Sequence, residues 1–532
     1  MTRFRRSCFL LVIAATVGLA AGAWAEGIFP VNDAGIGNWV FDQPSVVVNG
    51  TVLHLAFVGD SDTGADSSPD TRLYYAAVNG GADFTNKLTT RDQVIVTAPV
   101  AIEDTLFHQA RHPQIALRSA TQLEILFQAI PVGDTSYKLF LAVVTIDNNA
   151  VKTQLVKEVQ NPASGRMPGN LVDPSFGLVA ADNSLRVAYT DNSSGIGNVF
   201  YSRVGWDNAF LVGSSILLSS QPSSQGVQPL PRLRLDGNND SDIVWAANNS
   251  TDTPSPTGIY YAMVRRIPPS VVDTLAIGAT QVLSGGYRWG FPNVLVLNPS
   301  NVWILAADEP PIGSAGLAGS LAISQINPYA VIHDGNPVNV NNVGANSLFF
   351  LNPPGGSVLS SDFDAYRPEV DLDIQARVHV AGYGFRSSDG HGTPGRYYVM
   401  SLGTTASGAG TSAVFGSMIG SPVSVGIGDI AFALQLPGDY TRPAFVHFSG
   451  KSVNFWSGPD NVVTGARNLY VTSTFSPPDP TKQSGCSMVD DPRSDEGGRI
   501  PGAAVLLLPA FLLALRRAVR KAFGGRVGSA QG

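Results

Sequence analysis

The stretch that decides the fold is Pro174-Ser-Phe-Gly-Leu178, followed by Leu185-Arg-Val-Ala-Tyr189 and Val199-Phe-Tyr-Ser-Arg-Val204. Apolar residues tend to fall at every second position within these segments, which is the period of a β-strand. Proline cannot donate a ladder hydrogen bond, so it suits the first residue of a strand. The stretch therefore predicts three consecutive strands that begin at a proline.

The same order of strands recurs seven times along the chain. Each copy opens at a proline, and the openers are Pro44, Pro113, Pro174, Pro231, Pro292, Pro368 and Pro443. Their spacings are 69, 61, 57, 61, 76 and 75 residues, and a weaker fourth strand often precedes the next opener. A unit of three or four strands cannot bury its apolar face alone, whereas seven stacked copies can close into a ring.

We therefore predict an all-β body over residues 26–475, folded as a seven-bladed β-propeller with little helix. A pair of β-sandwich domains is the alternative, because sandwiches also use short strands at regular spacing. The last blade lacks a fourth strand of its own. We expect the segment Asn38-Trp-Val-Phe41, which precedes the first opener, to complete that blade and close the ring.

The first 25 residues have the features of a secretory signal peptide. A basic start is followed by an apolar run at residues 9–21, and Ala23-Trp-Ala25 fits a cleavage site. We expect an exported protein whose mature chain begins near Glu26. A membrane anchor that is retained is the alternative.

The C-terminal end has three parts in a fixed order. A spacer rich in proline and polar residues (476–485) leads to Gly485-Cys486-Ser-Met488, and an apolar run at residues 500–515 is followed by a basic cluster. As a helix the apolar run reaches about 24 Å, a little less than a hydrocarbon core of about 30 Å. Flanking arginines can snorkel and remain on the cytoplasmic side. We predict a transmembrane helix at about 500–515.

This tail, residues 486–532, resembles the bacterial C-terminal sorting signals, most closely the JDVT-CTERM type and secondly the MYXO-CTERM type. The resemblance implies that an intramembrane protease removes the tail, and that Gly485 and Cys486 mark the processing or attachment point. It further implies a protein held at the membrane or on the cell surface of a Gram-negative bacterium. A plain single-pass anchor is the alternative. Without the signal peptide, Cys486 is the only cysteine, so no internal disulfide is possible.

The charge of the body argues against nucleic-acid partners. The whole chain has a formal net charge of −7, and 24 basic residues stand against 37 acidic ones between Glu26 and Gly485. Such a body lacks the basic surface that binds phosphate backbones. The chain also contains no phosphate-binding loop, no serine-hydrolase elbow and no zinc motif. We expect no cofactor apart from possible Ca²⁺, and the sequence assigns no catalytic residues.

From about residue 38 to 475 the strand pattern resembles the sialidase-like (BNR-type) propeller repeat. The Asp-box of that family is absent, and the nearest stretch is Ser387-Ser-Asp-Gly-His-Gly-Thr393. Sialidases bind the substrate carboxylate with three arginines, since planar guanidinium groups match carboxylates. Here Arg367 and Arg442 directly precede opening prolines, and Arg111 lies two residues before one. The resemblance implies that these three could bind an anionic sugar; local ion pairs are the alternative.

One turn resembles the Ca²⁺ loop of FG-GAP or VCBS propeller repeats. It carries Asp236, Asn238, Asp240 and Asp242 at alternate positions, and such side-chain oxygens suit a hard cation. The first acidic position of that pattern is Arg234 here, and the resemblance covers one blade. A hairpin turn rich in Asn and Asp is the alternative.

Two other positions recur from blade to blade. The second strands share a polar position, which we interpret as facing solvent or a neighbouring blade and which holds His54, Glu124, Arg186, His379 and Asn454. The third strands share a tyrosine, which we interpret as packing between blades and which occurs as Tyr74, Tyr201, Tyr260, Tyr397 and Tyr470.

These features together predict a surface-anchored propeller outside the cytoplasm that binds carbohydrate or another protein without catalysis. A sialidase-like glycoside hydrolase and a structural envelope protein without a ligand are the alternatives.

The substitution Cys486→Ala should abolish processing of the tail or retention at the surface, because it removes the only thiol of the mature chain. Immunoblots of culture medium and membrane fractions measure both effects, and Cys8→Ala serves as the control. Unchanged processing and location in the Cys486 variant would contradict the prediction.

Overall fold

The computed structural model describes most of the body and neither end of the chain. The described residues are 29–32, 40–60, 71–82, 90–102, 105–193, 197–219, 229–248, 257–266, 272–283, 289–308, 320–328, 332, 348–350, 363–372, 378–386, 396–405, 414–418, 423–427, 443–448, 451–459 and 467–475. The chain divides into two compact units, residues 1–478 and 479–532, and every described residue lies in the first.

The described part is almost entirely strand, as predicted. One sheet has the order β29 (Ala444–Phe448), β30 (Lys451–Pro459), β31 (Arg467–Phe475), β2 (Val40–Asn49), β3 (Val52–Asp60), β4 (Arg72–Asn79) and β5 (Ile95–Ala101), with β1 (Phe29–Pro30) paired to β31. A four-stranded sheet follows as β6 (Phe107–Ser119), β7 (Gln122–Pro131), β8 (Lys138–Asp147) and β9 (Ala150–Glu158).

The remaining sheets have the same simple order along the chain. They are β12 (Leu171–Val179), β13 (Ser184–Asp191), β14 (Asn198–Gly205) and β15 (Ile216–Leu217); β16 (Arg232–Leu235), β17 (Ser241–Asn248), β18 (Thr257–Arg266) and β19 (Asp273–Leu283); β20 (Trp289–Asn298), β21 (Asn301–Asp308), β22 (Ser320–Ile326) and β23 (Leu348–Phe350); and β24 (Phe363–Leu372), β25 (Val378–Arg386), β26 (Arg396–Thr405) and β27 (Val414–Met418), with β28 (Val423–Ile427) on β26. Smaller elements are the pair β10 (Gln160–Asn161) and β11 (Gly165–Arg166), the helix α2 (Arg91–Val94) and the 3₁₀ turn η1 (Ala180–Asp182).

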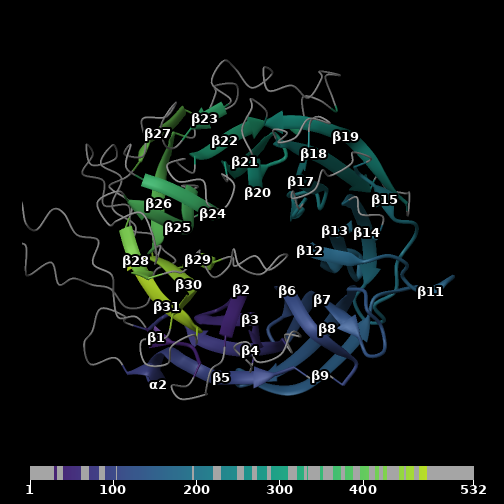
Figure 1. Cartoon of the computed structure of the whole chain (residues 1–532), viewed down its shortest axis with the longest axis horizontal. Coiled ribbons are helices and arrows are strands. Elements are labelled where there is room, and N and C mark those ends of the chain that lie inside the picture. The colour runs from purple at the N-terminus through teal and green to yellow at the C-terminus, as the bar shows by residue number, and fades with distance from the viewer. Residues whose placement is uncertain are drawn as a thin grey trace, which may run out of the picture. The chain divides into compact units, whose positions relative to one another are not determined.

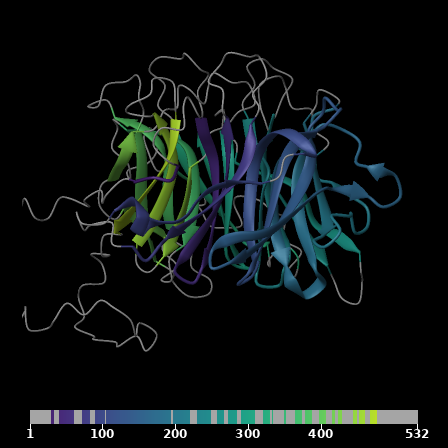
Figure 2. The same ribbon diagram turned by 90° about the horizontal axis from the view of Figure 1, so that it is seen from below.

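The first strands of the sheets contact one another in a closed cycle. β2 contacts β6, and the cycle continues through β12, β16, β20, β24 and β29 back to β2. Figure 1 shows these strands around a common centre, and Figure 2 shows that the strands run roughly along the viewing direction of Figure 1. This cyclic order is that of a β-propeller and differs from two separate sandwiches, in which no such cycle forms.

Apolar side chains from successive sheets form shared cores. One cluster joins Ala56 and Tyr75 of the first sheet to Phe107 and Phe127 of the next. Each of the other four clusters likewise draws buried side chains from two successive groups of strands. The sheets that contribute to these clusters therefore bury their faces against their neighbours, as the repeat predicted.

A stacked aromatic pair bridges the second and third strands of five repeats. The pairs are directly opposite in the ladder, with centroids 5.6 to 6.0 Å apart, and they are Phe57–Tyr74, Phe127–Phe140, Tyr189–Phe200, Trp245–Tyr260 and Trp456–Tyr470. The recurring tyrosine is thus a packing residue. For Tyr74, Tyr260 and Tyr470, the stacked aromatic partner lies within the same sheet. The side chain of Tyr397 lies outside the described residues.

The recurring polar position of the second strands is buried rather than exposed to solvent. His54, Glu124 and Asn454 have 0% exposure and Arg186 has 3%. Buried polar groups need partners, and His54 Nδ1 lies 2.7 Å from the Tyr75 hydroxyl. The side chain of His379 lies outside the described residues.

The first strands share a one-residue bulge at the opening proline. The ladder register shifts between Asp42 and Ser45 in β2, and equivalent shifts occur in β6, β12, β20 and β24. In five repeats the residue before the proline has a φ between 46° and 54°: Gln43, His112, Asp173, Leu230 and Phe291. A positive φ is uncommon and strained for residues other than glycine. Because it recurs at the same position in five repeats, it is a property of the repeat and not of a single strand.

The segment that closes the ring differs from the one predicted. Phe29 and Pro30 of β1 pair with β31, and the Val31 N–H donates to the Leu469 carbonyl at 2.7 Å. Val40 and Phe41 belong instead to β2 and pair with β3; Val40 also bridges to Arg467 of β31. The prediction of closure by an N-terminal segment holds, but β1 rather than Val40 and Phe41 is the strand that pairs along β31, and Asn38 and Trp39 lie outside the described residues. The proline pattern placed the start of the first strand too late, because β2 begins four residues before Pro44.

Among the described residues, no helix is long and apolar enough to span a bilayer. The predicted signal peptide, spacer, sorting signal and helix at 500–515 all lie outside the described residues, and so do Ala23, Ala25, Gly485 and Cys486.

The close approach of β12 and β16 gives a test of the packing between sheets. A Cβ on Gly177 would lie 2.6 Å from Leu235 Cγ, whereas a Cβ on Gly278 of β19 would meet nothing within 4 Å. Gly177→Val should lower the free energy of unfolding by about 1–3 kcal/mol through overpacking, and Gly278→Val should not. Urea unfolding of both variants measures the difference; equal stability would contradict the close contact.

Candidate functional site

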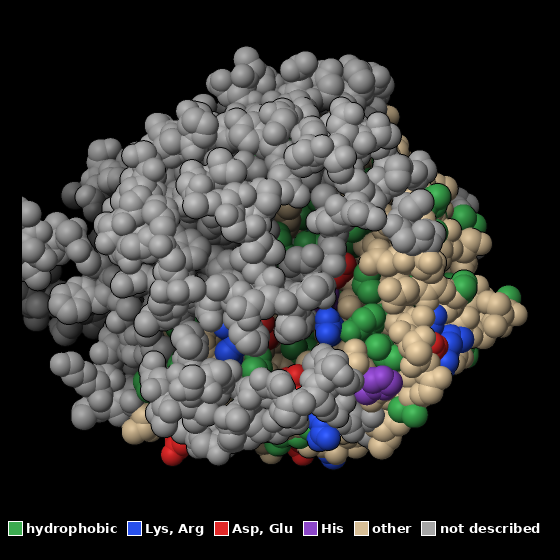
Figure 3. Space-filling view, viewed as in Figure 1, with side chains coloured by type: hydrophobic (Ala, Val, Ile, Leu, Met, Phe, Trp, Pro, Cys, Tyr) green, Lys and Arg blue, Asp and Glu red, His purple; other side chains and the backbone are tan. Residues whose placement is uncertain are grey.

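A cavity of about 300 Å³ lies where the first strands converge. All seven first strands, or the residues just before them, contribute to its lining, and the polar contributors include Gln43, His112, Asp173, Arg232, Asn293, Glu369 and Asp371. Figure 3, viewed as Figure 1, shows acidic, basic and hydrophobic side chains close together near the centre. The cavity therefore combines an apolar lining with a few convergent polar groups, as binding and active sites commonly do.

The bulge before each opening proline supplies part of this lining. Gln43, His112, Asp173 and Leu230 all have positive φ, and all four line the cavity. A bulge changes the direction of a side chain relative to a regular strand, and bulges are common beside active sites. The strained backbone conformation thus occurs at positions whose residues line the cavity.

His112 and Asp173 form a buried pair. His112 Nδ1 lies 2.6 Å from Asp173 Oδ1, and the two side chains are 13% and 5% exposed. The backbone is held as well, because the His112 N–H donates to Gln43 Oε1 and the Asp173 N–H donates to Gln128 Oε1. Imidazole and carboxylate in contact can hold and transfer a proton.

Glu369 is the second fixed carboxylate of the cavity. Arg232 Nη2 lies 2.5 Å from Glu369 Oε1, and the Asn293 side-chain amide donates to Glu369 Oε2 at 3.2 Å. These contacts join three first strands, β16, β20 and β24. The guanidinium and the amide both favour a negatively charged carboxylate. Asp371, on the same strand as Glu369, accepts a hydrogen bond from the His447 backbone N–H at 2.9 Å.

Three buried polar atoms of these side chains have no hydrogen-bond partner among the described residues. They are His112 Nε2, Asp173 Oδ2 and Arg232 Nε. A buried polar group without a partner costs about 1–3 kcal/mol. Their presence in one cavity is typical of a site that completes its hydrogen bonds with a ligand.

The structure does not bring the three predicted arginines together among the described residues. Arg111 lies on β6, half-buried, with its guanidinium 5.6 Å from the centroid of the Tyr137 ring, and it is not among the residues that line the cavity. The side chain of Arg367 and the whole of Arg442 lie outside the described residues. The arginine of the cavity that makes a described ion pair is Arg232, which follows its opening proline.

The predicted Ca²⁺ loop forms the turn between β16 and β17. The Asp236 side chain accepts from the N–H groups of Asn238 and Asp240, which is an Asx turn, and Arg265 pairs with Asp240 at 2.8 Å. Burial raises the pKa of Asp242 to about 7, and Asp242 accepts a hydrogen bond from Tyr261. No group of three or more metal-binding side chains was found within the described ranges.

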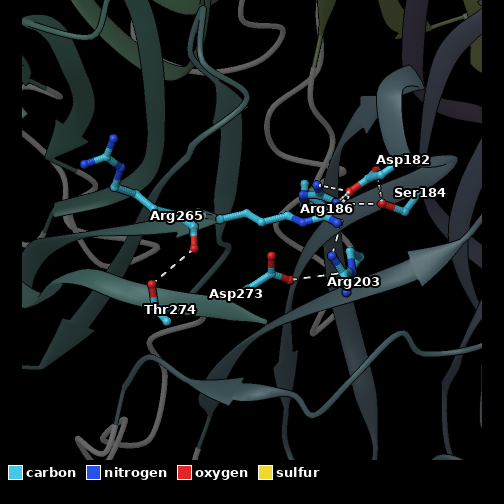
Figure 4. A network of polar contacts seen from close by, with 8 residues as sticks. Asp182, Ser184, Arg186, Arg203, Arg265, Asp273 and Thr274 are labelled. Atoms are coloured by element: carbon cyan, nitrogen blue, oxygen red, sulfur yellow. Dashed lines mark hydrogen bonds and ion pairs between the residues drawn. The ribbon is translucent and has the colours of Figure 1, made fainter. Parts of the chain in front are cut away.

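A polar network between the sheets of β13 and β18 lies away from the cavity lining (Figure 4). Asp182 pairs with Arg186 at 2.6 Å and also with Arg266, and Arg203 lies 3.7 Å from Asp273. Burial alone would raise the pKa of Asp182, but the hydrogen bonds and charges of these partners outweigh it and lower the pKa. The network ties two sheets together and is structural.

The sequence reasoning missed the main polar residues of the cavity: Gln43, His112, Asp173, Arg232, Asn293 and Glu369. A signal for half of them was present, because Gln43, His112 and Asp173 directly precede opening prolines. Nothing in the sequence indicates that Arg232, Asn293 and Glu369, which lie one residue after their prolines, come together.

Comparison with known proteins gives matches among solved structures only. No family model matches the chain, and no curated protein sequence matches it. The polysaccharide lyase Uly1 matches with 9% identity over 83% of this chain and 90% of its own, with a TM-score of 0.42. The GH93 α-L-arabinofuranosidase of Fusarium graminearum matches with 12% identity over 71% and 98%, with a TM-score of 0.39. An endo-arabinase from Bacteroides thetaiotaomicron matches with 12% identity over 57% and 97%, with a TM-score of 0.33.

Other matched structures are likewise named as glycoside hydrolases or arabinan-degrading enzymes, among them a thermostable family-43 glycoside hydrolase and an exo-1,5-α-L-arabinanase. This finding overturns the prediction of a binding module without catalysis and agrees better with the alternative of a glycoside hydrolase. The prediction failed because the carboxylates of the cavity come from separate strands and could not be paired by register.

A buried carboxyl outside the cavity gives a prediction for pH. Glu124 has 0% exposure, and burial raises its pKa to about 8 even though Arg118 lies 3.3 Å away and acts in the other direction. An unfolded Glu titrates near 4.5. The native state therefore binds the extra proton between these values, and its stability falls as the pH rises from about 4.5 through 8.

Glu124→Gln should reduce this slope, to which the buried Asp242 also contributes, and raise the free energy of unfolding at pH 9 by about 2–4 kcal/mol relative to the parent. Arg118 keeps its contact with Asp207 at 2.8 Å in the variant. Urea unfolding at pH 5 and pH 9 measures the effect, with the exposed Asp147→Asn as control. Equal free energies of unfolding of the parent at pH 5 and pH 9 would contradict a raised pKa of the buried Glu124 carboxyl.

Proposed function

We propose that this chain is an exported enzyme that hydrolyses glycosidic bonds in the central cavity of a seven-bladed β-propeller. The observation that carries the proposal is the convergence of two fixed carboxylates, Asp173 and Glu369, on one cavity. Glycoside hydrolysis commonly uses such a pair, one carboxyl group as the proton donor and one carboxylate as the base or nucleophile.

The surroundings of the two groups suit different roles. Glu369 contacts Arg232 and Asn293, which favour the charged carboxylate needed for a base or nucleophile. Asp173 is nearly enclosed and shares a short contact with His112, so this pair can hold a proton and release it to a leaving oxygen.

The blade count and the ends of the chain are part of the same proposal. The eight-stranded sheet is counted as two blades, β2–β5 and β29–β31 with β1, which meet at the bridge between Val40 and Arg467. The N-terminal 25 residues direct export, and the tail with Cys486 holds the protein at the membrane or cell surface of a Gram-negative bacterium after processing by an intramembrane protease. An extracellular carbohydrate is then within reach of the cavity.

The purified full chain should hydrolyse at least one member of a panel of 4-nitrophenyl glycosides and plant polysaccharides. Asp173→Asn and Glu369→Gln should each lower kcat by about 10²-fold or more, the usual contribution of a general acid or base. Asp147→Asn, at an exposed carboxylate on the last residue of β8, is the matched control and should leave the rate unchanged. Absence of turnover on the whole panel, or unchanged rates in both cavity variants, would sink the proposal.

A further inference from the structure

The cavity holds more unsatisfied hydrogen-bonding capacity than an acid and a base require. His112 uses Nδ1 for Asp173, and its Nε2 has no partner among the described residues. Arg232 uses Nη2 for Glu369, and its Nε likewise has none in the described part. Both side chains line the cavity and are at least 86% buried, so water cannot freely replace a missing partner.

The position of His112 in the cavity lining requires a strained backbone conformation. Its φ of 48° is strained for a residue other than glycine, and proline follows directly, which restricts the residue before it further. The strained conformation is fixed by the His112 N–H bond to Gln43 Oε1 at 2.7 Å. A strained residue held by its surroundings is commonly part of a functional site.

We propose that His112 Nε2 and Arg232 Nε form a binding subsite for two hydroxyl groups of an uncharged sugar unit, an inference that rests on the proposed function. Arg232 Nε–H can only donate, and His112 Nε2 accepts when Nδ1 carries the proton toward Asp173. A sugar hydroxyl both donates and accepts, so neighbouring hydroxyls satisfy both atoms. The buried Leu230, which has the same position before its proline, supplies an apolar wall for the C–H face of the ring.

The charge of the described lining selects a neutral sugar over an acidic one. Three carboxylates, Asp173, Glu369 and Asp371, stand against the guanidiniums of Arg232 and Arg234. Arg232 is already paired with Glu369, and Arg234 is exposed to solvent. A carboxylate on the ligand would therefore meet negative charge in a partly enclosed space, which disfavours its binding.

The test measures binding rather than turnover, in the full chain with Glu369 unchanged, because Glu369 must stay paired with Arg232 for the charge argument to apply. The probes are the methyl glycosides of arabinose, xylose, galactose and glucose, together with those of galacturonic and glucuronic acid. At least one neutral probe should bind, and each uronide should bind more weakly than its neutral counterpart. Adding His112→Asn should weaken binding about tenfold or more, because it removes the reach of Nε2 while Asn tolerates a positive φ.

The matched control is His108→Asn, which changes the other described histidine of β6 and does not affect the cavity lining. Circular dichroism and thermal unfolding establish that both variants fold; if His112→Asn does not, His112→Gly, which also tolerates a positive φ, takes its place. Binding of no neutral probe, tighter binding of a uronide, or an unchanged Kd in the His112 variant overturns the inference. If only the Kd of the His112 variant is unchanged, loss of turnover on the substitution Asp173→Asn would still support the proposed function. Failure of this inference and failure of the proposed function are therefore distinguishable.

Discussion

The burial of the apolar faces of successive sheets against one another is the constraint on which the rest of this structure depends. Each core cluster takes its side chains from two neighbouring groups of strands, and no sheet could exclude water from those faces alone. Packing of this kind joins β29–β31 to β2–β5 and continues through the sheets that begin with β6, β12, β16 and β20. Residues 29–32 join the N-terminal end of the body to its last strands. They pair with β31, and Asn32 forms hydrogen bonds with both Leu469 and Asn468.

The cavity is a consequence of the same packing. When the sheets pack face to face, their first strands are brought to a common centre, and side chains far apart in the sequence become neighbours. Arg232 and Glu369 are 137 residues apart and form an ion pair. The bulge at the opening prolines then determines which side chains line the cavity, since it interrupts the regular alternation of a strand. Strain in the backbone is compensated by packing and hydrogen bonds elsewhere in the sheets.

The sequence predicted the strands well because proline, period-two apolar residues and turn residues act locally. It predicted that the ends of the body meet but chose residues 38–41 over Phe29–Pro30, since a two-residue strand has almost no periodic signal. The site was harder for a different reason. His112 and Asp173 could be noticed before their prolines, yet their contact depends on the geometry between β6 and β12, which no local pattern encodes. Glu369 and its partners come together only through the ring.

The most direct test of the central claim is a cross-link between the first and last segments of the body. In a chain with Cys8→Ser and Cys486→Ser, the pair Asn32→Cys and Asn468→Cys replaces two side chains that share a 2.7 Å hydrogen bond across 436 residues of sequence. Closed packing predicts an intramolecular disulfide on mild oxidation, seen as faster migration on a non-reducing gel and loss of two free thiols. The pair Asn32→Cys and Asp147→Cys should not form one. Two thiols that stay free in the Asn32 and Asn468 pair, or that link only separate molecules, would contradict the closed ring.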